Sequence, residues 1–376
     1  MSTSDREVFI AKAIELARRA EGRTSPNPLV GAVVVQGGEI VGVGFHAQAG
    51  APHAEIHALR MAAEKARGAD LYVNLEPCCH QGRTPPCTNA IIAAGIRRVF
   101  IGILDPNPQV DGKGIAALRR AGIEVETGIL AEACRRLNEA YCKFITTRLP
   151  FVTLKFAASL DGKIATTTGA SKWISGEASR RFVHELRNRN DAISVGVGTI
   201  LADDPRLTTR IEGGRDPLCL IFDSHLRTPP EARVFHAASA RRVIIATRRE
   251  PTPQERERFA GVGAEILSFP GDEGGVSIPH VLRELGKRDV MSLLVEGGGR
   301  LGAAFLGNRN ASPAEPLADK FYLFLAPCIF GGDAYPLFPG FGIEAVGEAI
   351  SLRDTRSWRL GEDLAFEGYF THGDER

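Results

Sequence analysis

The chain has 376 residues, of which 44% are hydrophobic and 24% charged, a composition typical of a soluble globular protein with room for two domains. Its net charge is +1 and its paired arginines are scattered, which argues against a nucleic-acid partner and favours a small-molecule substrate. The sequence contains no membrane-length apolar stretch, no signal core in residues 1–20 and no disulfide framework among its seven cysteines, so we expect a cytoplasmic protein without a membrane partner.

The first half of the chain alternates helix and strand patterns. The turn at residues 36–39 joins two β-rich runs and predicts a hairpin. The predicted strands are 31–35, 40–45, 71–75 and 99–103, and the predicted helices are 6–20, 54–67, one opening at Pro86, 112–121 and 130–145. This alternation predicts a sheet sandwiched between helices.

A break in the helical pattern at residues 146–150 predicts a domain boundary, with domains at 1–147 and 148–376. The second half also alternates helices and strands, and residues 308–316 have the composition of an exposed loop. The predicted strands there are 151–157, 191–196, 217–222, 242–247, 264–268, 290–295 and 319–325. Because this half has no metal motif, it is a different domain and not a duplication.

His53 is followed by Glu55, and two later Pro-Cys steps contribute Cys78 and Cys87. One imidazole and two thiolates are a ligand set for zinc that leaves a fourth coordination position open. The pattern is close to that of zinc deaminases, in which the glutamate moves protons and does not bind the metal. The sequence therefore predicts one catalytic zinc per chain, with Glu55 as general acid and base.

Two other readings of these cysteines are buried small hydrophobic residues and a closed structural zinc site. A structural site usually has Cys-x-x-Cys pairs, and none is present, although Cys79 and His80 leave another choice of ligand open. Pro86 suits the first turn of a helix, whose N-terminus stabilises Cys87 as a thiolate. Residues 79–85 form a long polar excursion between the cysteines, able to contact a large substrate.

The glycine-rich segment 297–302 follows an apolar run and precedes a predicted helix, so its backbone amides could cradle a phosphate. A turn that needs glycine only for close packing is the competing interpretation. The segment lies near the end of its domain, which argues for nucleotide binding on a sheet other than the Rossmann type. Arg187 and Arg210 could hold a phosphate, although a surface role is the default for either one, and Trp173 taken alone suggests a core residue.

The zinc motif extends into His53-Ala-Glu-Ile-His-Ala-Leu59 and Leu75-Glu-Pro-Cys-Cys-His-Gln-Gly-Arg-Thr-Pro-Pro-Cys87. Four further segments are Ser25-Pro-Asn-Pro-Leu-Val-Gly31, Leu154-Lys-Phe-Ala-Ala-Ser-Leu-Asp-Gly162, Leu201-Ala-Asp-Asp-Pro205 and Val295-Glu-Gly-Gly298. These segments lie in both halves of the chain and follow the order of the bifunctional deaminase-reductases of bacterial riboflavin biosynthesis. The chain resembles that family over nearly its whole length. Cys79 departs from that family, in which a serine is more usual.

The resemblance implies a two-domain α/β protein that associates into a homo-oligomer. Its N-terminal three-layer domain would be cytidine-deaminase-like and its C-terminal domain dihydrofolate-reductase-like, with NADPH as cofactor. The substrate would be a phosphoribosyl-pyrimidine, which is deaminated and then reduced from ribosyl to ribityl.

The resemblance also assigns residues to ligands. Asn27 would contact the pyrimidine, and His46 and His80 the phosphoribosyl tail. Residues expected around NADPH are Ala157, Trp173, Thr199, Asp203, Ser224, Gly298, Gly299, Arg300, Leu301 and Gly302. Those expected around the phosphorylated substrate are Ser171, Arg187, Leu207, Arg210 and Glu296. Asp203 is also the expected proton-handling residue of the reduction.

Two alternatives belong to other functional classes. A tRNA or nucleobase deaminase with a non-catalytic nucleotide-binding second domain would share the zinc chemistry, but the basic surface is missing and residues 151–376 would be unexplained. A non-catalytic zinc or nucleotide-binding protein would have no use for Glu55.

Overall fold

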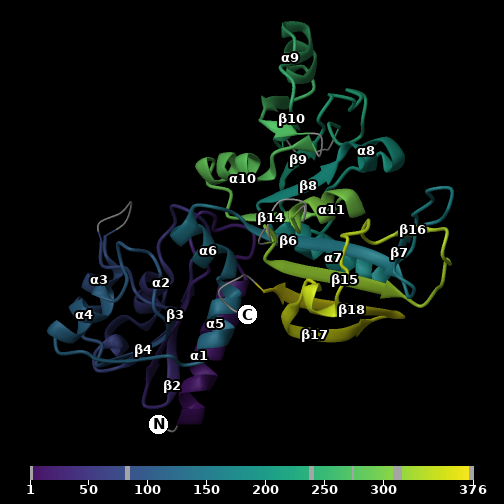
Figure 1. Ribbon diagram of the computed structural model, residues 1–376. Helices are drawn as coiled ribbons and strands as arrows, with labels where there is room; N and C mark the ends of the chain where they lie inside the picture. Colours follow the sequence, from purple (N-terminus) through teal and green to yellow (C-terminus); the bar gives the residue numbers. More distant parts are fainter. Residues whose placement is uncertain (1–2, 81–84, 237–240, 273–274, 308–315, 372–376) are drawn as a thin grey trace. The chain divides into compact units, whose positions relative to one another are not determined.

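The computed structural model describes residues 3–80, 85–236, 241–272, 275–307 and 316–371. It divides the chain into two compact units, Met1–Leu149 and Pro150–Arg376, each built around its own sheet (Figure 1). No described helix has the length and apolar character that crossing a bilayer requires. The loop expected at residues 308–316 lies outside the described residues, except for its last residue.

The N-terminal unit has a five-stranded sheet in the order β2-β1-β3-β4-β5, in which β3, β4 and β5 are parallel and β1 is antiparallel to both its neighbours. Ala32 and Val34 pack in one core with residues of α2, α3 and α4, while α1 contacts β1 and β3, where Phe9 packs on Tyr72. The strands are β1 (Gly31–Gln36), β2 (Glu39–Phe45), β3 (Asp70–Leu75), β4 (Arg98–Ile103) and β5 (Glu124–Thr127), and the helices α1 (Thr3–Arg18), α2 (Ala54–Ala62), α3 (Cys87–Ala93), α4 (Lys113–Arg120), α5 (Ala131–Leu137) and α6 (Glu139–Thr147). The expected three-layer architecture is confirmed.

Two glycines in β2 allow α2 to lie directly on the sheet. A Cβ atom at Gly44 would lie 2.3 Å from the carbonyl oxygen of Ala54, and one at Gly42 would lie 2.2 Å from that of Ala58. Larger residues at either position would push the helix away. The start of α2, where His53 and Glu55 lie, is therefore held against the sheet.

Three details of this unit differ from the sequence-based prediction. The helix expected at 130–145 is broken at Asn138, whose side chain accepts a hydrogen bond from the Leu29 backbone N–H and donates one to the Leu29 carbonyl. The helix expected at 54–67 ends at Ala62 and continues as the 3-10 turn Ala63–Ala66. Strand β5 was not predicted, because it is short and mostly exposed and lacks a clear apolar pattern.

The C-terminal unit has a nine-stranded sheet in the order β11-β10-β9-β8-β14-β6-β15-β18-β17, in which the strands from β11 to β15 are parallel and β18 is antiparallel to both its neighbours. All seven predicted strands are present, and the two C-terminal antiparallel strands are additional. The strands are β6 (Phe151–Ser159), β8 (Ala192–Gly196), β9 (Leu218–Phe222), β10 (Val243–Thr247), β11 (Ala264–Ser268), β14 (Ser292–Val295), β15 (Lys320–Ala326), β17 (Leu352–Leu360) and β18 (Asp363–Phe370). The helices are α7 (Glu177–Arg189), α8 (Val197–Asp203), α9 (Pro253–Ala260), α10 (Ile278–Lys287) and α11 (Gly299–Phe305), and short elements are β7 (Lys163–Ala165), β12 (Gly271–Asp272), β13 (Gly275–Val276), β16 (Tyr335–Pro336) and the 3-10 turn Val346–Glu348.

Candidate active sites

Three side chains from three separate segments form a cluster of donor atoms in the N-terminal unit. His53 is the N-cap of α2, Cys87 is the first residue of α3, and Cys78 lies in the loop after β3. His53 Nδ1 lies 3.2 Å from Cys87 Sγ and 3.4 Å from Cys78 Sγ, and the donor atoms all lie within 4.8 Å of one another. Tetrahedral zinc, with bonds of about 2.3 Å to sulfur and about 2.0 Å to nitrogen, needs ligand atoms roughly 3.5–3.8 Å apart. The cluster therefore fits zinc.

The same cluster stabilises negative charge on sulfur. Hydrogen bonding with Cys87 lowers the pKa of Cys78 to about 4, and His53 acts in the same direction. The Cys87 backbone N–H also donates to Cys78 Sγ over 3.3 Å. The pairing with Cys78 raises the pKa of Cys87 and that of His53. Without a metal, Cys87 and His53 therefore hold their protons more tightly. A bound divalent cation displaces these protons, because zinc is ligated by thiolates and neutral imidazole.

Glu55 lies in the first turn of α2 and is 3% exposed. Its Oε2 atom is buried without a hydrogen-bond partner among the described residues. Burial raises the pKa of Glu55 to about 7, and the negative charge of Cys78 adds to the effect. A buried carboxyl that exchanges its proton near neutral pH suits general acid-base chemistry. Among the described residues the cluster has three donors, and together with Glu55 this favours a catalytic zinc over a closed structural site.

Cys79 and His80, the neighbours that could have replaced Cys78 as ligands, do not belong to the donor cluster. His80 Nδ1 is buried and has no hydrogen-bond partner within the described part of the chain. A buried polar atom of this kind is available to a ligand. Residues 81–84 of the polar excursion lie outside the described residues.

Asn27 and His46 lie together beside the metal ligands. The rings of His46 and His53 are 5.4 Å apart, and His46 is only 2% exposed. Because the Pro52 carbonyl can only accept, His46 Nδ1 donates to it over 3.2 Å, and His46 Nε2 then accepts from Asn27 Nδ2 over 3.0 Å. Both ring nitrogens of His46 are thus bonded within the protein, and its direct contact with a substrate would require a rearrangement.

Asp105→Asn is expected to raise the free energy of unfolding at neutral pH. Asp105 is 5% exposed and accepts hydrogen bonds from the Tyr141 hydroxyl and the Asn107 backbone, and burial raises its pKa from 3.8 to about 6. The folded state thus binds the Asp105 proton more tightly than the unfolded chain does. The contribution of this proton to the free energy of unfolding is full below about pH 4 and is lost as the pH rises from there through about 6. Urea unfolding should show the variant more stable by about 3 kcal/mol at pH 7 and nearly equal at pH 4. A difference that does not change with pH would contradict the assigned burial cost.

In the C-terminal unit, most residues expected around the cofactor lie at one edge of the sheet. Carboxyl ends of neighbouring parallel strands meet at one edge, where ligands of open α/β sheets bind. Ala157 lies in β6, Thr199 in α8 directly after β8, Ser224 two residues after β9, and Gly298, Gly299, Arg300, Leu301 and Gly302 at the start of α11 after β14. Ala157, Thr199 and Ser224 are each partly exposed, as ligand contacts must be.

A buried ion-pair network lies among the residues expected around the phosphorylated substrate. Arg187 in α7 donates to both carboxylate oxygens of Glu296, over 2.6 and 2.8 Å, and Lys155 Nζ lies 3.9 Å from the same carboxylate. Burial opposes ionisation of Glu296, but Arg187 and Lys155 act together in the opposite direction, and the pKa of Glu296 is lowered. Burial and the positive charge of Arg187 lower the pKa of Arg210. Two cations thus share the Glu296 carboxylate, and a third, Arg210, feels the charge of Arg187, which favours an anionic ligand. Leu207 is 3% exposed, so only its backbone is available for a contact.

Asp203 ends α8 beside two polar side chains. Ser171 Oγ lies 3.3 Å and Lys172 Nζ lies 3.4 Å from Asp203 Oδ1, and the Asp203 side chain is 29% exposed. Trp173 is 70% exposed, with the Arg180 guanidinium 5.0 Å from its ring centre. The interpretation of Trp173 as a core residue is therefore wrong. An exposed indole in the segment whose Ser171 and Lys172 contact Asp203 suits a ligand surface instead.

The glycine-rich segment 297–302 contains glycines that packing requires and one glycine that leaves room for a phosphate. A Cβ atom at Gly302 would lie 2.4 Å from Phe156, and one at Gly299 would lie 2.3 Å from the Leu337 carbonyl, so these positions need glycine for packing. Gly298 differs, because it is exposed, its φ is −71°, and no described atom lies within 4 Å of an added Cβ. Open space at the start of a helix is where a phosphate can approach backbone N–H groups.

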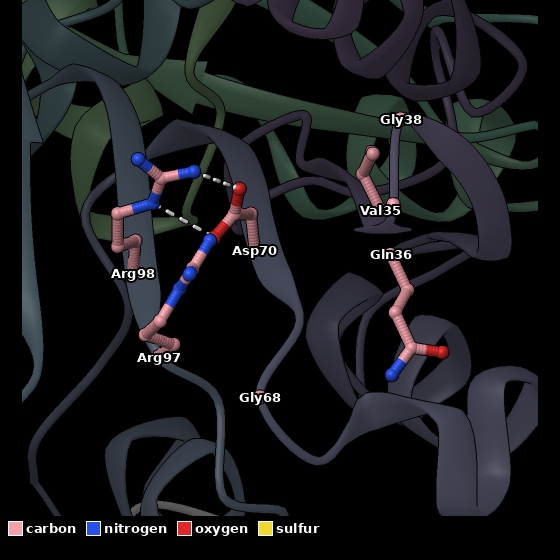
Figure 2. A pocket seen from close by; sticks show the side chains of 8 residues that line it. Val35, Gln36, Gly38, Gly68, Asp70, Arg97 and Arg98 are labelled. Carbon is pink, nitrogen blue, oxygen red and sulfur yellow. Dashed lines mark hydrogen bonds and ion pairs between the residues drawn. The ribbon is translucent and has the colours of Figure 1, made fainter. Parts of the chain in front are cut away.

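A shallow hollow of about 280 Å³ lies at the other edge of the N-terminal sheet, at the amino ends of β3 and β4 (Figure 2). Figure 2 shows Arg98 pointing at Asp70, to which it donates two hydrogen bonds of 2.9 and 2.5 Å. Arg97 lies 3.3 Å from the same carboxylate, which is almost fully buried. The arginines therefore satisfy a buried carboxylate between two strands, which is a structural role.

Comparison with known proteins gives matches in both units. The model of the cytidine and deoxycytidylate deaminase zinc-binding region matches residues 3–103, and that of the RibD C-terminal domain matches residues 150–366. The riboflavin biosynthesis protein RibD of Aquifex aeolicus is 44% identical over 362 residues, covering 95% of this chain and 96% of that protein. RibD of Escherichia coli is 38% identical over 371 residues, covering 95% and 97%. The chain belongs to the RibD family of riboflavin biosynthesis proteins.

Solved structures of RibD proteins have the same fold. RibD of Acinetobacter baumannii is 35% identical with a TM-score of 0.87, covering 99% of this chain and all of that one. The Thermotoga maritima deaminase/5-amino-6-(5-phosphoribosylamino)uracil reductase is 38% identical with a TM-score of 0.84, covering 98% and 99%. This member of the family is thus a bifunctional enzyme with a zinc-binding deaminase domain and a reductase domain that uses NADPH. A nucleobase deaminase with a non-catalytic second domain is not favoured, because the RibD C-terminal domain model matches the second unit.

Proposed function

We propose that this chain carries out two consecutive steps on one phosphorylated pyrimidine. Residues 1–147 deaminate 2,5-diamino-6-(5-phosphoribosylamino)pyrimidin-4-one to its uracil counterpart. Residues 148–376 then reduce the ribosyl group with NADPH to give 5-amino-6-(5-phosphoribitylamino)uracil. The observation that carries the proposal is the buried Glu55 beside three metal donors within 4.8 Å of one another, in a chain whose RibD likeness extends through both domains.

In the deamination, Glu55 moves the protons. His53, Cys78 and Cys87 would hold the zinc, which would activate a water molecule for attack on the ring carbon that bears the amine. Glu55 accepts a proton from that water and delivers it to the ring and the departing amine, which its pKa of about 7 suits. Asn27, its amide held by His46, contacts the pyrimidine.

The remaining contacts of the deamination site hold the phosphoribosyl tail. His80, whose Nδ1 has no partner among the described residues, reaches this tail. His46 contacts it if its bonds to Asn27 and Pro52 rearrange when substrate binds.

In the reduction, the chain aligns two ligands. NADPH supplies the hydride for the first carbon of the sugar, opened from its ring. The cofactor is held by Ala157, Trp173, Thr199, Asp203, Ser224 and residues 298–302, and the substrate by Ser171, Arg187, the Leu207 backbone, Arg210 and Glu296. Glu296 fixes the Arg187 guanidinium before substrate arrives, and Arg210 adds charge for the phosphate. Asp203 handles the proton that accompanies the hydride.

Gly298→Ala is expected to weaken NADPH binding about tenfold and to leave the thermal unfolding temperature unchanged. Its backbone conformation is open to alanine, and the added methyl group would occupy only the space proposed for the cofactor. Gly302→Ala tests the packing role of the same segment, because its methyl group would collide with Phe156 and should lower the unfolding temperature. Calorimetric titration of NADPH and thermal unfolding check the pair. Wild-type NADPH affinity in the Gly298 variant would exclude a phosphate at this turn.

We further propose that the enzyme acts in the cytoplasm as a homo-oligomer, without a nucleic-acid or membrane partner. The net charge of +1 and the scattered arginines support the absence of nucleic acid, and the resemblance to the riboflavin family supports the oligomer. Light scattering on the purified protein tests the oligomer, since a monomer at micromolar concentration would contradict it.

An assay that follows both reactions tests the proposed function. The full chain is incubated with zinc and the diaminopyrimidine substrate, and ammonia and nicotinamide absorbance are followed. We expect ammonia release without NADPH, and NADPH oxidation only when the deaminated product has formed or is added. Oxidation of NADPH at the same rate when deamination is blocked and no product is added would contradict the order of the steps.

A further inference from the structure

We propose that Glu76 is a positioning residue for the zinc ligand Cys78. Glu76 lies between β3 and Cys78 and is 3% exposed. Its Oε1 accepts a hydrogen bond from the Ile115 backbone N–H over 3.1 Å, and its Oε2 accepts from those of Gly112 and Asp105 over 3.0 and 3.3 Å. One carboxylate thus ties the segment that carries Cys78 to the loop after β4 and to the start of α4.

The charge of Glu76 suits this position. The first N–H groups of a helix have no partner within the helix, and Gly112 and Ile115 provide such groups at the start of α4. A carboxylate there gains from charge-assisted hydrogen bonds and from the helix dipole. A buried carboxylate is costly unless its oxygens are bonded, and three donors satisfy them.

A second contact holds the same segment independently of the carboxylate. A Cβ atom at Gly114 would lie 2.3 Å from the Pro77 carbonyl oxygen, so the first turn of α4 packs directly against the peptide that leads into Cys78. On the other side, the Thr88 backbone N–H at the start of α3 donates to the Cys78 carbonyl over 3.2 Å. His53 and Cys87 lie at helix starts, whereas Cys78 lies in a loop. Cys78 therefore depends on these contacts from α3 and α4 for its position.

Glu76→Gln should disturb the ligand geometry with little change in volume. Glutamine has one acceptor oxygen, and its NH2 group would face backbone N–H groups that need an acceptor. Substitution of groups that orient metal ligands typically weakens metal binding about 10- to 100-fold. The inference rests on the proposed zinc centre at His53, Cys78 and Cys87, and it predicts at least tenfold faster zinc release from the variant.

The experiment uses the full chain loaded with zinc and measures zinc release to a chromogenic chelator, together with thermal unfolding. Leu118→Ala is the matched control, because Leu118 is a fully buried residue of α4 that makes no contact with the carboxylate in the described hydrogen bonds. We expect Glu76→Gln to release zinc at least tenfold faster than the wild type, and Leu118→Ala to lower the unfolding temperature at an unchanged release rate. Equal release from Glu76→Gln and wild type, or equally fast release from Leu118→Ala, would overturn the proposal.

Two further measurements separate positioning from general loss of structure. Cobalt substituted for zinc should show altered thiolate-to-metal absorption bands in Glu76→Gln and wild-type bands in Leu118→Ala. Gly114→Ala keeps the carboxylate but places a methyl group 2.3 Å from the Pro77 carbonyl oxygen and 3.0 Å from Glu76 Oε1, in a helix that alanine favours. It should therefore disturb both contacts of this segment and is also expected to accelerate zinc release. Wild-type protein that binds no zinc in the same assay would refute the proposed metal centre itself, which is a different outcome from equal release.

Discussion

Glu55→Gln is expected to lower the rate of ammonia release by at least 10²- to 10⁴-fold, the usual contribution of a positioned general acid-base group. Glutamine keeps the size of the side chain but cannot accept and return a proton. Glu55 is not one of the metal donors, so the zinc content should stay at one per chain. Ammonia release and elemental analysis on the same preparation check both statements.

The control for this variant is Glu64→Gln, the same chemical change at an exposed position shortly after α2. It should deaminate at the wild-type rate. NADPH oxidation with added deaminated product should also be normal in Glu55→Gln, because that reaction belongs to the other domain. Deamination by Glu55→Gln within tenfold of the wild type would remove Glu55 from the proposed mechanism.

Asp203→Asn is expected to slow NADPH oxidation by about 10²- to 10⁴-fold if Asp203 handles the proton of the reduction. Asparagine can still accept the hydrogen bond from Ser171, and the Asp203 side chain is partly exposed, so the fold should survive the change. Steady-state oxidation of NADPH with the deaminated substrate measures the effect. A fall in kcat with little change in KM indicates a role in the chemical step.

Asp204→Asn is the matched control, since Asp204 is the next residue and its Oδ1 accepts from the Arg233 backbone N–H over 2.8 Å. That bond persists with asparagine, so reduction should be normal. Ammonia release should be unchanged in both variants. An unchanged kcat in Asp203→Asn would exclude Asp203 as the proton-handling group and direct attention to the neighbouring Lys172, whose Nζ lies 3.4 Å away.

The zinc site was predictable from sequence because its chemistry is carried by residue types at fixed spacing. His53, Cys78 and Cys87 were named from the motif, and the structure brings their donor atoms together. Glu76 was not identified, although it belongs to the same motif. Its partners Gly112 and Ile115 lie 36 and 39 residues further along the chain, a pairing that only the fold creates. A charged residue directly after a buried strand was the available signal.

The strands of the parallel sheet were predictable because they are buried on both faces and their sequences are continuous apolar runs. Strand β17 was missed for the opposite reason. It is an exposed edge strand rich in charged residues, such as Arg353, Asp354 and Arg356, and it has no apolar alternation to detect. The charges also protect an open sheet edge from pairing with other chains.

The glycine segment illustrates a limit of motifs. Sequence could not separate a phosphate turn from a packing turn, since both select glycine. The structure separates them position by position, because Gly302 lies against Phe156 whereas Gly298 has open space.

X-ray absorption at the zinc edge of the purified full chain tests the central claim most directly. The account predicts one zinc per chain with two sulfur ligands at about 2.3 Å and two lighter ligands at about 2.0 Å, one of them exchangeable. Absence of stoichiometric zinc, or a closed shell of four protein ligands, would contradict it.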